Sequence, residues 1–336
     1  MDMQVWLKNM VSPGPKKALP ILSFPSVSKL GVTVKELVWD SALQARGMKL
    51  TADAVPTAAA VSMMDLSVEA EAFGAQIRYS DGEVPTVTGA LVSDPEEAEA
   101  LAVPAVGSGR TGLCLEAIRE AARLITDRPV FAGTIGPFSL AGRLMDVSEA
   151  LVNCYAEPEM VHTVMRKATD FLTAYLLEYR KTGANGVVIA EPLAGLLSLS
   201  LTEEFVEPYL KELVDAVQTD QFLIILHNCG GSTVQTVSSI LRCGASGCHF
   251  GNAVSMEELL EKIPENTLVM GNVDPAGVFR SGTPEDVRRE TMKLMDACCR
   301  YPNFVVSSGC DIPPAAPWEN IHAFFDAVEQ FYRQAR

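Results

Sequence analysis

His227 and Cys229 are the residues of this sequence whose types and spacing most directly predict chemistry. They follow an apolar run at 223–226 and precede two glycines, Gly230 and Gly231. Such a run is typical of a buried strand that ends at a turn. Because residues i and i+2 of a strand point to the same side, the imidazole and the thiol can face one point. Both groups are preferred zinc ligands, so a third ligand from elsewhere in the chain would complete a metal site.

The elements that must position these residues form a regular alternation. Nearly all of the predicted strands are followed by a predicted helix, as over 34–46 and over 202–216, where Thr202 is the expected N-cap. This pattern is typical of a (β/α)8 TIM barrel, an α/β fold. The eight predicted strands are 18–24, 58–64, 129–133, 186–190, 222–227, 247–250, 267–271 and 304–308.

The chain organisation that follows is a single TIM-barrel domain over 1–336. We expect residues 1–17 to form an N-terminal helical extension. The segment 76–90 alternates and contains Asp81-Gly82, which predicts a β-hairpin excursion. A doubly wound open sheet is the alternative, although no Gly-x-Gly-x-x-Gly follows a predicted strand.

Polar residues gather at the predicted strand ends, where TIM barrels carry their active sites. They are Asp65, Glu191, His227, Asn228, Cys229, Asn272, Asp274, Cys310 and Asp311. Cys310 follows the last strand, so it faces the same end of the barrel as Cys229. With His227 these cysteines would leave one zinc position open, as in catalytic zinc sites.

Two observations keep alternatives to this metal site open. An isolated His-x-Cys pair is more often accidental than metal-binding. Cys248 and His249 are adjacent in a predicted strand and face opposite sides, so they cannot chelate one ion together, although one of them can point into the barrel.

Composition excludes several function classes. The chain has 27 Lys and Arg against 42 Asp and Glu, a formal net charge of -15, which disfavours nucleic acid and anionic membranes as partners. No signal peptide and no uncharged apolar run of spanning length is present. The 8 cysteines without a secretory signal indicate reduced thiols and a cytoplasmic location.

A family resemblance rests on the residues around the proposed ligands. The segments 227–231, 308–314 and 317–320 resemble the uroporphyrinogen decarboxylase superfamily. More narrowly, they resemble its zinc-dependent corrinoid:thiol methyltransferase branch, which includes methylcobalamin:coenzyme M methyltransferases. The segments 64–74 and 271–275 also fit, so the resemblance covers essentially the whole chain.

The resemblance implies an enzyme that carries Zn²⁺ on His227, Cys229 and Cys310. A substrate thiol, coenzyme M or a similar small thiol, would be activated as a zinc thiolate. It would then take the methyl group of a methyl-Co(III) corrinoid such as methylcobalamin, delivered by a corrinoid carrier protein. Glu191 would either relay the proton of the substrate thiol or hydrogen-bond to one of the zinc ligands and orient it. Four further strand-end residues would line the substrate pocket, namely Asp65, Asn228, Asn272 and Asp274, and the alternative for Asp274 is that it only shapes the turn before Pro275.

One departure from the family separates the possible activities. Decarboxylases of the superfamily carry an arginine-rich segment after the first strand that binds the substrate carboxylates. The corresponding segment here, 22–29, contains no arginine. A metal-independent decarboxylase-like lyase is therefore the second interpretation, and a non-catalytic corrinoid-binding protein is the third. A homodimer remains an open expectation.

Overall fold

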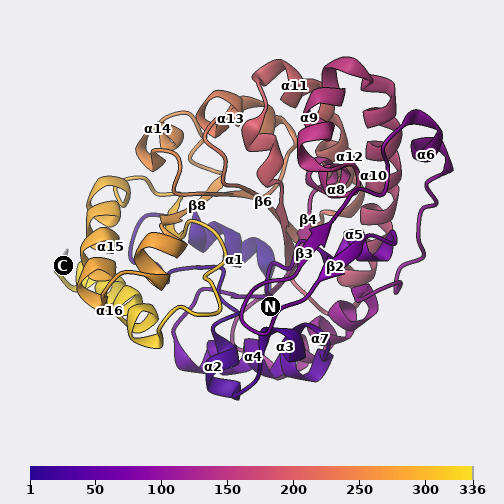
Figure 1. Cartoon of the computed structure of the whole chain (residues 1–336). Coiled ribbons are helices and arrows are strands. Elements are labelled where there is room, and N and C mark those ends of the chain that lie inside the picture. The colour runs from indigo at the N-terminus through magenta and orange to yellow at the C-terminus, as the bar shows by residue number, and fades with distance from the viewer. Residues whose placement is uncertain (335–336) are drawn as a thin grey trace.

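A seven-stranded parallel sheet forms the centre of the protein (Figure 1). The computed structural model describes residues 1–334. Neighbouring strands follow one another in chain order, which distinguishes the curled sheet of a TIM barrel from a doubly wound sheet. The strands are β1 Ala60–Val61, β4 Val130–Ile135, β5 Gly186–Ala190, β6 Leu223–Asn228, β7 Gly247–Phe250, β8 Leu268–Val273 and β9 Phe304–Ser308.

The first predicted strand, 18–24, is not a regular strand, although it lies where the eighth barrel strand belongs. The Leu19 N–H donates to the Val306 carbonyl of β9 at 3.0 Å, and the Ala58 N–H, just before β1, donates to the Ala18 carbonyl at 2.8 Å. The segment therefore bridges the two edges of the sheet. The segment makes too few backbone hydrogen bonds to count as a strand, although its apolar pattern predicts one.

Helices surround the sheet and connect its strands. They are α1 Met3–Met10, α2 Ser26–Leu30, α3 Val34–Val38, α4 Ser41–Ala54, α5 Val68–Ala72, α6 Pro95–Ala100, α7 Thr111–Leu124, α8 Pro137–Met145, α9 Val147–Ala156, α10 Pro158–Lys181, η1 Pro192–Leu196, α11 Leu199–Phe205, α12 Glu207–Val217, α13 Thr233–Arg242, α14 Met256–Leu260, η2 Pro275–Arg280, α15 Pro284–Cys298 and α16 Trp318–Gln334. No helix within residues 1–334 is long and apolar enough to cross a membrane.

Two predicted helices are each divided in the structure. The helix expected over 34–46 breaks before α4, because the Asp40 side chain accepts from the Leu43 N–H and caps a new helix. The helix expected over 202–216 begins earlier, with Ser198 rather than Thr202 as its N-cap. It breaks at Val206, and Pro208 lies in the first turn of the next helix, where a missing N–H costs nothing.

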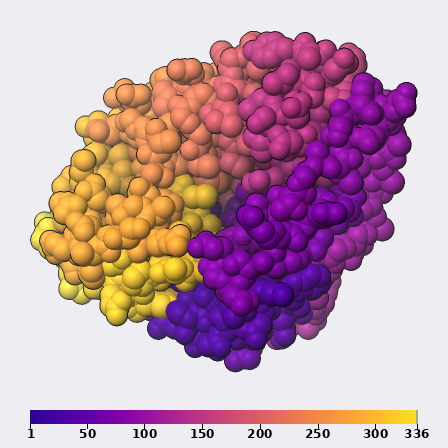
Figure 2. All heavy atoms as spheres, in the orientation of Figure 1, coloured from indigo at the N-terminus to yellow at the C-terminus, as the bar shows by residue number. Residues whose placement is uncertain are grey.

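The two ends of the barrel differ in what covers them. At the N-terminal ends of the strands, α1 packs its apolar side chains against the barrel interior, and the Trp6 indole donates to the Ala58 carbonyl at 3.3 Å. At the opposite end a hollow opens between the yellow C-terminal part of the chain and the purple part that includes the hairpin of β2 (Gln76–Arg78) and β3 (Thr86–Thr88) (Figure 2). The strand-end residues face this open end.

Candidate metal centre

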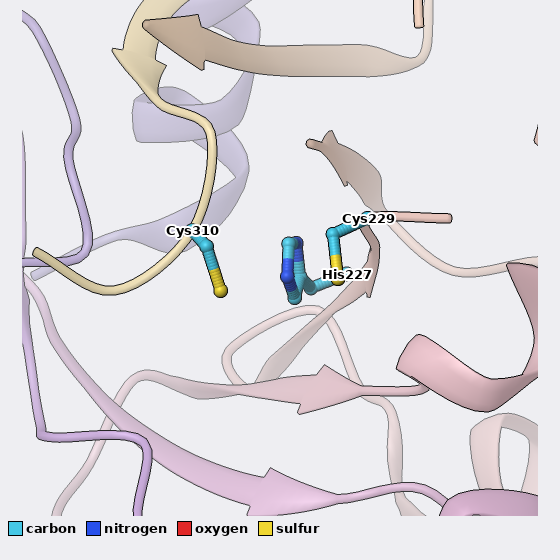
Figure 3. Close-up of side chains that lie close together, drawn as sticks. All are labelled: His227, Cys229 and Cys310. Carbon is cyan, nitrogen blue, oxygen red and sulfur yellow. The ribbon is translucent and has the colours of Figure 1, made fainter. Parts of the chain in front are cut away.

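The structure brings His227, Cys229 and Cys310 together (Figure 3). His227 lies near the end of β6, Cys229 directly follows that strand, and Cys310 follows β9 on the facing side. One ligand atom from each lies within 4.8 Å of the others. A tetrahedral zinc site with bonds of about 2.0–2.3 Å has edges of about 3.3–3.8 Å, so the three side chains need little movement to share an ion.

The two thiols of this group shift each other's pKa in opposite directions. A hydrogen bond from the Cys310 thiol lowers the pKa of Cys229 well below its usual value, and His227 adds to the effect. The same hydrogen bond, together with burial, raises the pKa of Cys310. Cys229 is therefore the thiol of the pair that loses its proton more easily, and the thiolate is the form that binds a metal ion.

A series of hydrogen bonds behind His227 determines which of its two ring nitrogens carries the proton. The Ser307 hydroxyl donates to the Leu19 carbonyl at 2.7 Å, so the Ser307 oxygen accepts from the Nε2–H of His249 at 2.8 Å. Burial lowers the pKa of His249 well below its usual value, so the ring is neutral. Its Nδ1 then accepts from the Nδ1–H of His227 at 2.7 Å.

Because these hydrogen bonds place the proton of the neutral His227 ring on Nδ1, its Nε2 carries a lone pair. That nitrogen is buried and has no hydrogen-bond partner among residues 1–334. An unsatisfied buried nitrogen is costly unless something else occupies it. A metal ion coordinated at Nε2 would satisfy it, and fixing the free ring nitrogen by a hydrogen bond is the usual arrangement of metal-binding histidines.

Replacing His249 with phenylalanine is expected to weaken zinc binding about 10- to 100-fold, because the variant keeps the ring but removes the acceptor that orients His227. Competition with a chromophoric chelator measures this affinity. The matched control is His162→Phe, which removes another histidine hydrogen bond, to the Tyr209 hydroxyl at 2.8 Å, outside the metal group. Equal zinc affinities in wild type and a folded His249→Phe variant would contradict the role of His249.

His249 is the residue of this site that sequence reasoning missed. His227 and His249 are paired across β6 and β7, and residues paired in neighbouring strands face the same side of a sheet. The signal in the sequence is a histidine in each of two consecutive predicted strands. Using it requires the register between them, and a slip of one residue would turn His249 to the opposite face.

The turn after β6 holds Cys229 in place. The Asn228 side-chain oxygen accepts from the Gly230 N–H at 3.0 Å and from the Thr233 hydroxyl at 2.9 Å. A side chain on Gly251 would place its Cβ 2.5 Å from Cβ of Cys229, so only glycine fits beside this cysteine. Asn228, predicted to line the substrate pocket, thus has its side-chain oxygen engaged in the turn.

Three other predicted site residues also bond to the backbone around them. The Glu191 carboxylate accepts from the N–H groups of Phe138 at 3.0 Å and Ser139 at 2.5 Å, at the start of α8, and burial raises the pKa of Glu191 to about 7. The Asn272 amide donates to two loop carbonyls, and Asp274 caps η2. Within residues 1–334, neither Glu191 nor Asp274 belongs to the group formed by the three candidate ligands.

Asp65 lies in a separate buried charge cluster. Its carboxylate pairs with the guanidinium of Arg110, whose side chain is fully buried. Arg110 also contacts the Glu71 carboxylate at 2.7 Å and the Ser67 hydroxyl at 2.8 Å. Burial alone would lower the pKa of Arg110, but Asp65 and Glu71 raise it. Asp65 is predicted to bind substrate, but in the structure its carboxylate is engaged in an internal ion pair with Arg110.

Known proteins similar to this chain include both methyltransferases and decarboxylases. A methylcobamide:CoM methyltransferase of Methanosarcina acetivorans is 29% identical over 271 residues, which are 80% of this chain and 78% of that protein. A uroporphyrinogen decarboxylase of Dichelobacter nodosus is 27% identical over 286 residues, 83% of this chain and 81% of that protein. Several methyltransferases are thus among the relatives, beside decarboxylases of comparable identity.

The solved structures support the fold. A methyltransferase from Methanosarcina mazei superposes with a TM-score of 0.85 at 23% identity and covers 99% of both chains. At this identity the likeness concerns the fold alone. The family model described as "Uroporphyrinogen decarboxylase (URO-D)" matches residues 23–331, nearly the whole chain, including all three candidate ligands. The protein therefore belongs to the uroporphyrinogen decarboxylase family of enzymes.

Proposed function

We propose that this protein transfers a methyl group from a methyl-Co(III) corrinoid to a small thiol, at a zinc site formed by His227, Cys229 and Cys310. The observation that carries the proposal is the convergence of one imidazole nitrogen and two sulfurs within 4.8 Å, with the Nε2 of His227 left unbonded. Three protein ligands leave a fourth position for a substrate, as in catalytic zinc sites. The methylcobamide:CoM methyltransferase relatives agree with this assignment.

The reaction exchanges one bond to the methyl carbon for another. The thiol sulfur forms a C–S bond as the Co–C bond breaks, and the electron pair of that bond stays on cobalt. Cobalt is thereby reduced from Co(III) to Co(I), the product is a thioether, and the thiol proton leaves to solvent. Zinc bound at this site would supply the lowered pKa that makes the substrate thiol a thiolate at neutral pH.

The protein residues contribute charge and orientation to this step. His227 is a neutral donor, whereas Cys229 and Cys310 are anionic ligands when deprotonated, so the set would keep a substrate sulfur electron-rich. The barrel has a hollow at the end where the candidate ligands lie, and we propose that a carrier protein brings the corrinoid to it (Figure 2). The cofactor carries the methyl chemistry, and the barrel brings the two substrates together.

The decarboxylase interpretation is the second candidate, because decarboxylases of similar identity are among the relatives. A substrate with several carboxylates requires fixed cations. The segment 22–29 offers Lys29 as its one cation, and Lys29 lies over the Trp318 ring at 4.4 Å. A decarboxylase would also leave the His227, Cys229 and Cys310 group without a role.

The test is zinc content and thiol-dependent demethylation of methylcobalamin in protein purified under reducing conditions without chelator. We expect about one zinc per chain and formation of cob(I)alamin with at least one small thiol, followed by its absorbance under anaerobic conditions. Uroporphyrinogen decarboxylation by protein that holds no zinc and leaves methylcobalamin intact would overturn the proposal in favour of the second candidate.

A further inference from the structure

Arg143 is a half-buried cation without a partner. It lies in the last turn of α8, and no hydrogen bond or ion pair reaches its guanidinium from any residue between 1 and 334. Burial lowers the pKa of Arg143, and no neighbouring group offsets that effect. Holding a partly desolvated charge without a counterion costs free energy. In a chain of 42 acidic residues, a carboxylate partner would have been easy to supply.

Arg143 lines a pocket of about 220 Å³. The walls come from the loop after β1 and from the hairpin. Most of the lining side chains are apolar, namely Met64, Leu66, Val84, Pro85 and Val87, and two carry hydroxyls, Ser67 and Thr86. Among the lining residues that the structure describes, Arg143 is the one with a charge. A single fixed cation within apolar walls suits a small organic anion, because a guanidinium can donate two parallel hydrogen bonds to a sulfonate, carboxylate or phosphate.

One wall of the pocket is joined to the loop that carries Cys310. Met64 lines the pocket, and the Met64 N–H donates to the Asp311 carboxylate at 2.8 Å, so this wall is tied to the residue that follows Cys310. The helix that carries Arg143 is fixed from the other side, since Glu191, at the end of β5, accepts from the N–H groups of its first turn. The pocket is thus tied to the loop after β9, which carries Cys310, and the helix of Arg143 is tied to the end of β5.

We propose that Arg143 and its pocket bind the anionic group of a substrate of the methyl transfer. This inference rests on the proposed function and extends it to the charge of the substrate. Two sources of the anion share this chemistry: a sulfonate or carboxylate on the thiol, and the phosphodiester of the nucleotide loop of a complete corrinoid. A favourable charge at the C-terminus of α8 is the purely structural role that the test must separate from binding.

The test compares wild type with Arg143→Met and Arg143→Lys in steady-state methyl transfer. We expect Arg143→Met to raise KM for 2-mercaptoethanesulfonate about tenfold or more, with little change for neutral 2-mercaptoethanol, because a charge-assisted hydrogen bond is lost. Arg143→Lys should recover part of the loss. Arg123→Met is the matched control, since Arg123 is also an unpaired cation in the last turn of a helix, α7, but is exposed.

The source of the anion is distinguished by the methyl donor. If Arg143→Met instead raises KM for methylcobalamin and leaves KM for methylcobinamide, which lacks the phosphodiester, unchanged, the pocket binds the corrinoid. Equal effects of Arg143→Met and Arg123→Met on every substrate would reduce Arg143 to a helix-end charge and overturn the proposal.

A binding measurement separates this inference from the proposed function. Ethanesulfonate has the anion but no thiol, so calorimetric titration detects the pocket without zinc or methyl transfer. We expect it to bind wild type and Arg123→Met but not Arg143→Met. If wild type transfers no methyl group to any thiol, the proposed function fails, while this titration still decides whether Arg143 binds an anion.

Discussion

Replacing Cys310 with alanine is expected to reduce bound zinc from about one per chain to a small fraction and to lower kcat/KM for methyl transfer more than about 100-fold. Loss of a hydrogen bond behind a metal ligand already costs up to about 100-fold, and loss of a ligand should cost more. Cys310 is the informative position because it follows β9, whereas the other two candidate ligands lie at the end of β6 and directly after it. Zinc content by elemental analysis and cob(I)alamin formation measure the two effects.

Cys299→Ala is the matched control for this variant. Cys299 is also half-buried, but it lies at the end of α15 and its sulfur is 3.8 Å from the Tyr332 hydroxyl, away from the metal group. The control should keep both zinc and activity. Full zinc occupancy in folded Cys310→Ala would exclude Cys310 as a ligand, and normal activity with lost zinc would exclude zinc from the chemistry.

The meeting of the three candidate ligands was predictable because it depends on features that a sequence displays. Alternation of apolar strands with helices indicates parallel strands, and parallel strands bring their C-terminal ends to one end of a barrel. The period of two along a strand then orients His227 and Cys229 together. These steps need neither the register of the sheet nor the exact ends of the helices.

The supporting contacts were not predictable from the same features. His249 reaches His227 only in the observed register of β6 and β7. Polarity at a strand end also has two meanings, since a side chain there can bind a substrate or satisfy loop backbone. The Asn228 and Asp274 side chains hydrogen-bond to their own loops, a use that composition does not separate from ligand binding.

The division of the helices follows from local capping that competes with periodicity. Apolar spacing continues through Asp40 and through Val206, so it predicts one helix in each region. Asp40 accepts from the Leu43 N–H at 2.9 Å, and this single bond makes a new helix start favourable. The buried Arg110 cluster is harder still to predict from the sequence, because its members are separated by as many as 45 residues in the chain.

Replacing Arg110 with methionine is expected to lower the free energy of unfolding by about 3–5 kcal/mol, the usual cost of removing one partner from a buried ion pair. The variant keeps much of the side-chain length but leaves the carboxylates of Asp65 and Glu71 without their cation. The Glu71 carboxylate also accepts from the Tyr79 hydroxyl, next to the β2–β3 hairpin. Loss of Arg110 should therefore loosen the hairpin as well, which hydrogen exchange of residues 76–88 would report.

The size of this effect is what distinguishes a buried charge cluster from a surface ion pair. Arg119→Met is the control on α7, the helix that directly follows Arg110, because Arg119 pairs with Glu116 in solvent and its loss should cost less than about 1 kcal/mol. Asp65→Asn in the Arg110→Met background should recover part of the loss, since it removes one of the two stranded charges. Urea unfolding that places both single variants within about 1 kcal/mol of wild type would mean that water compensates the Asp65 and Glu71 carboxylates, and the cluster would then contribute little to stability.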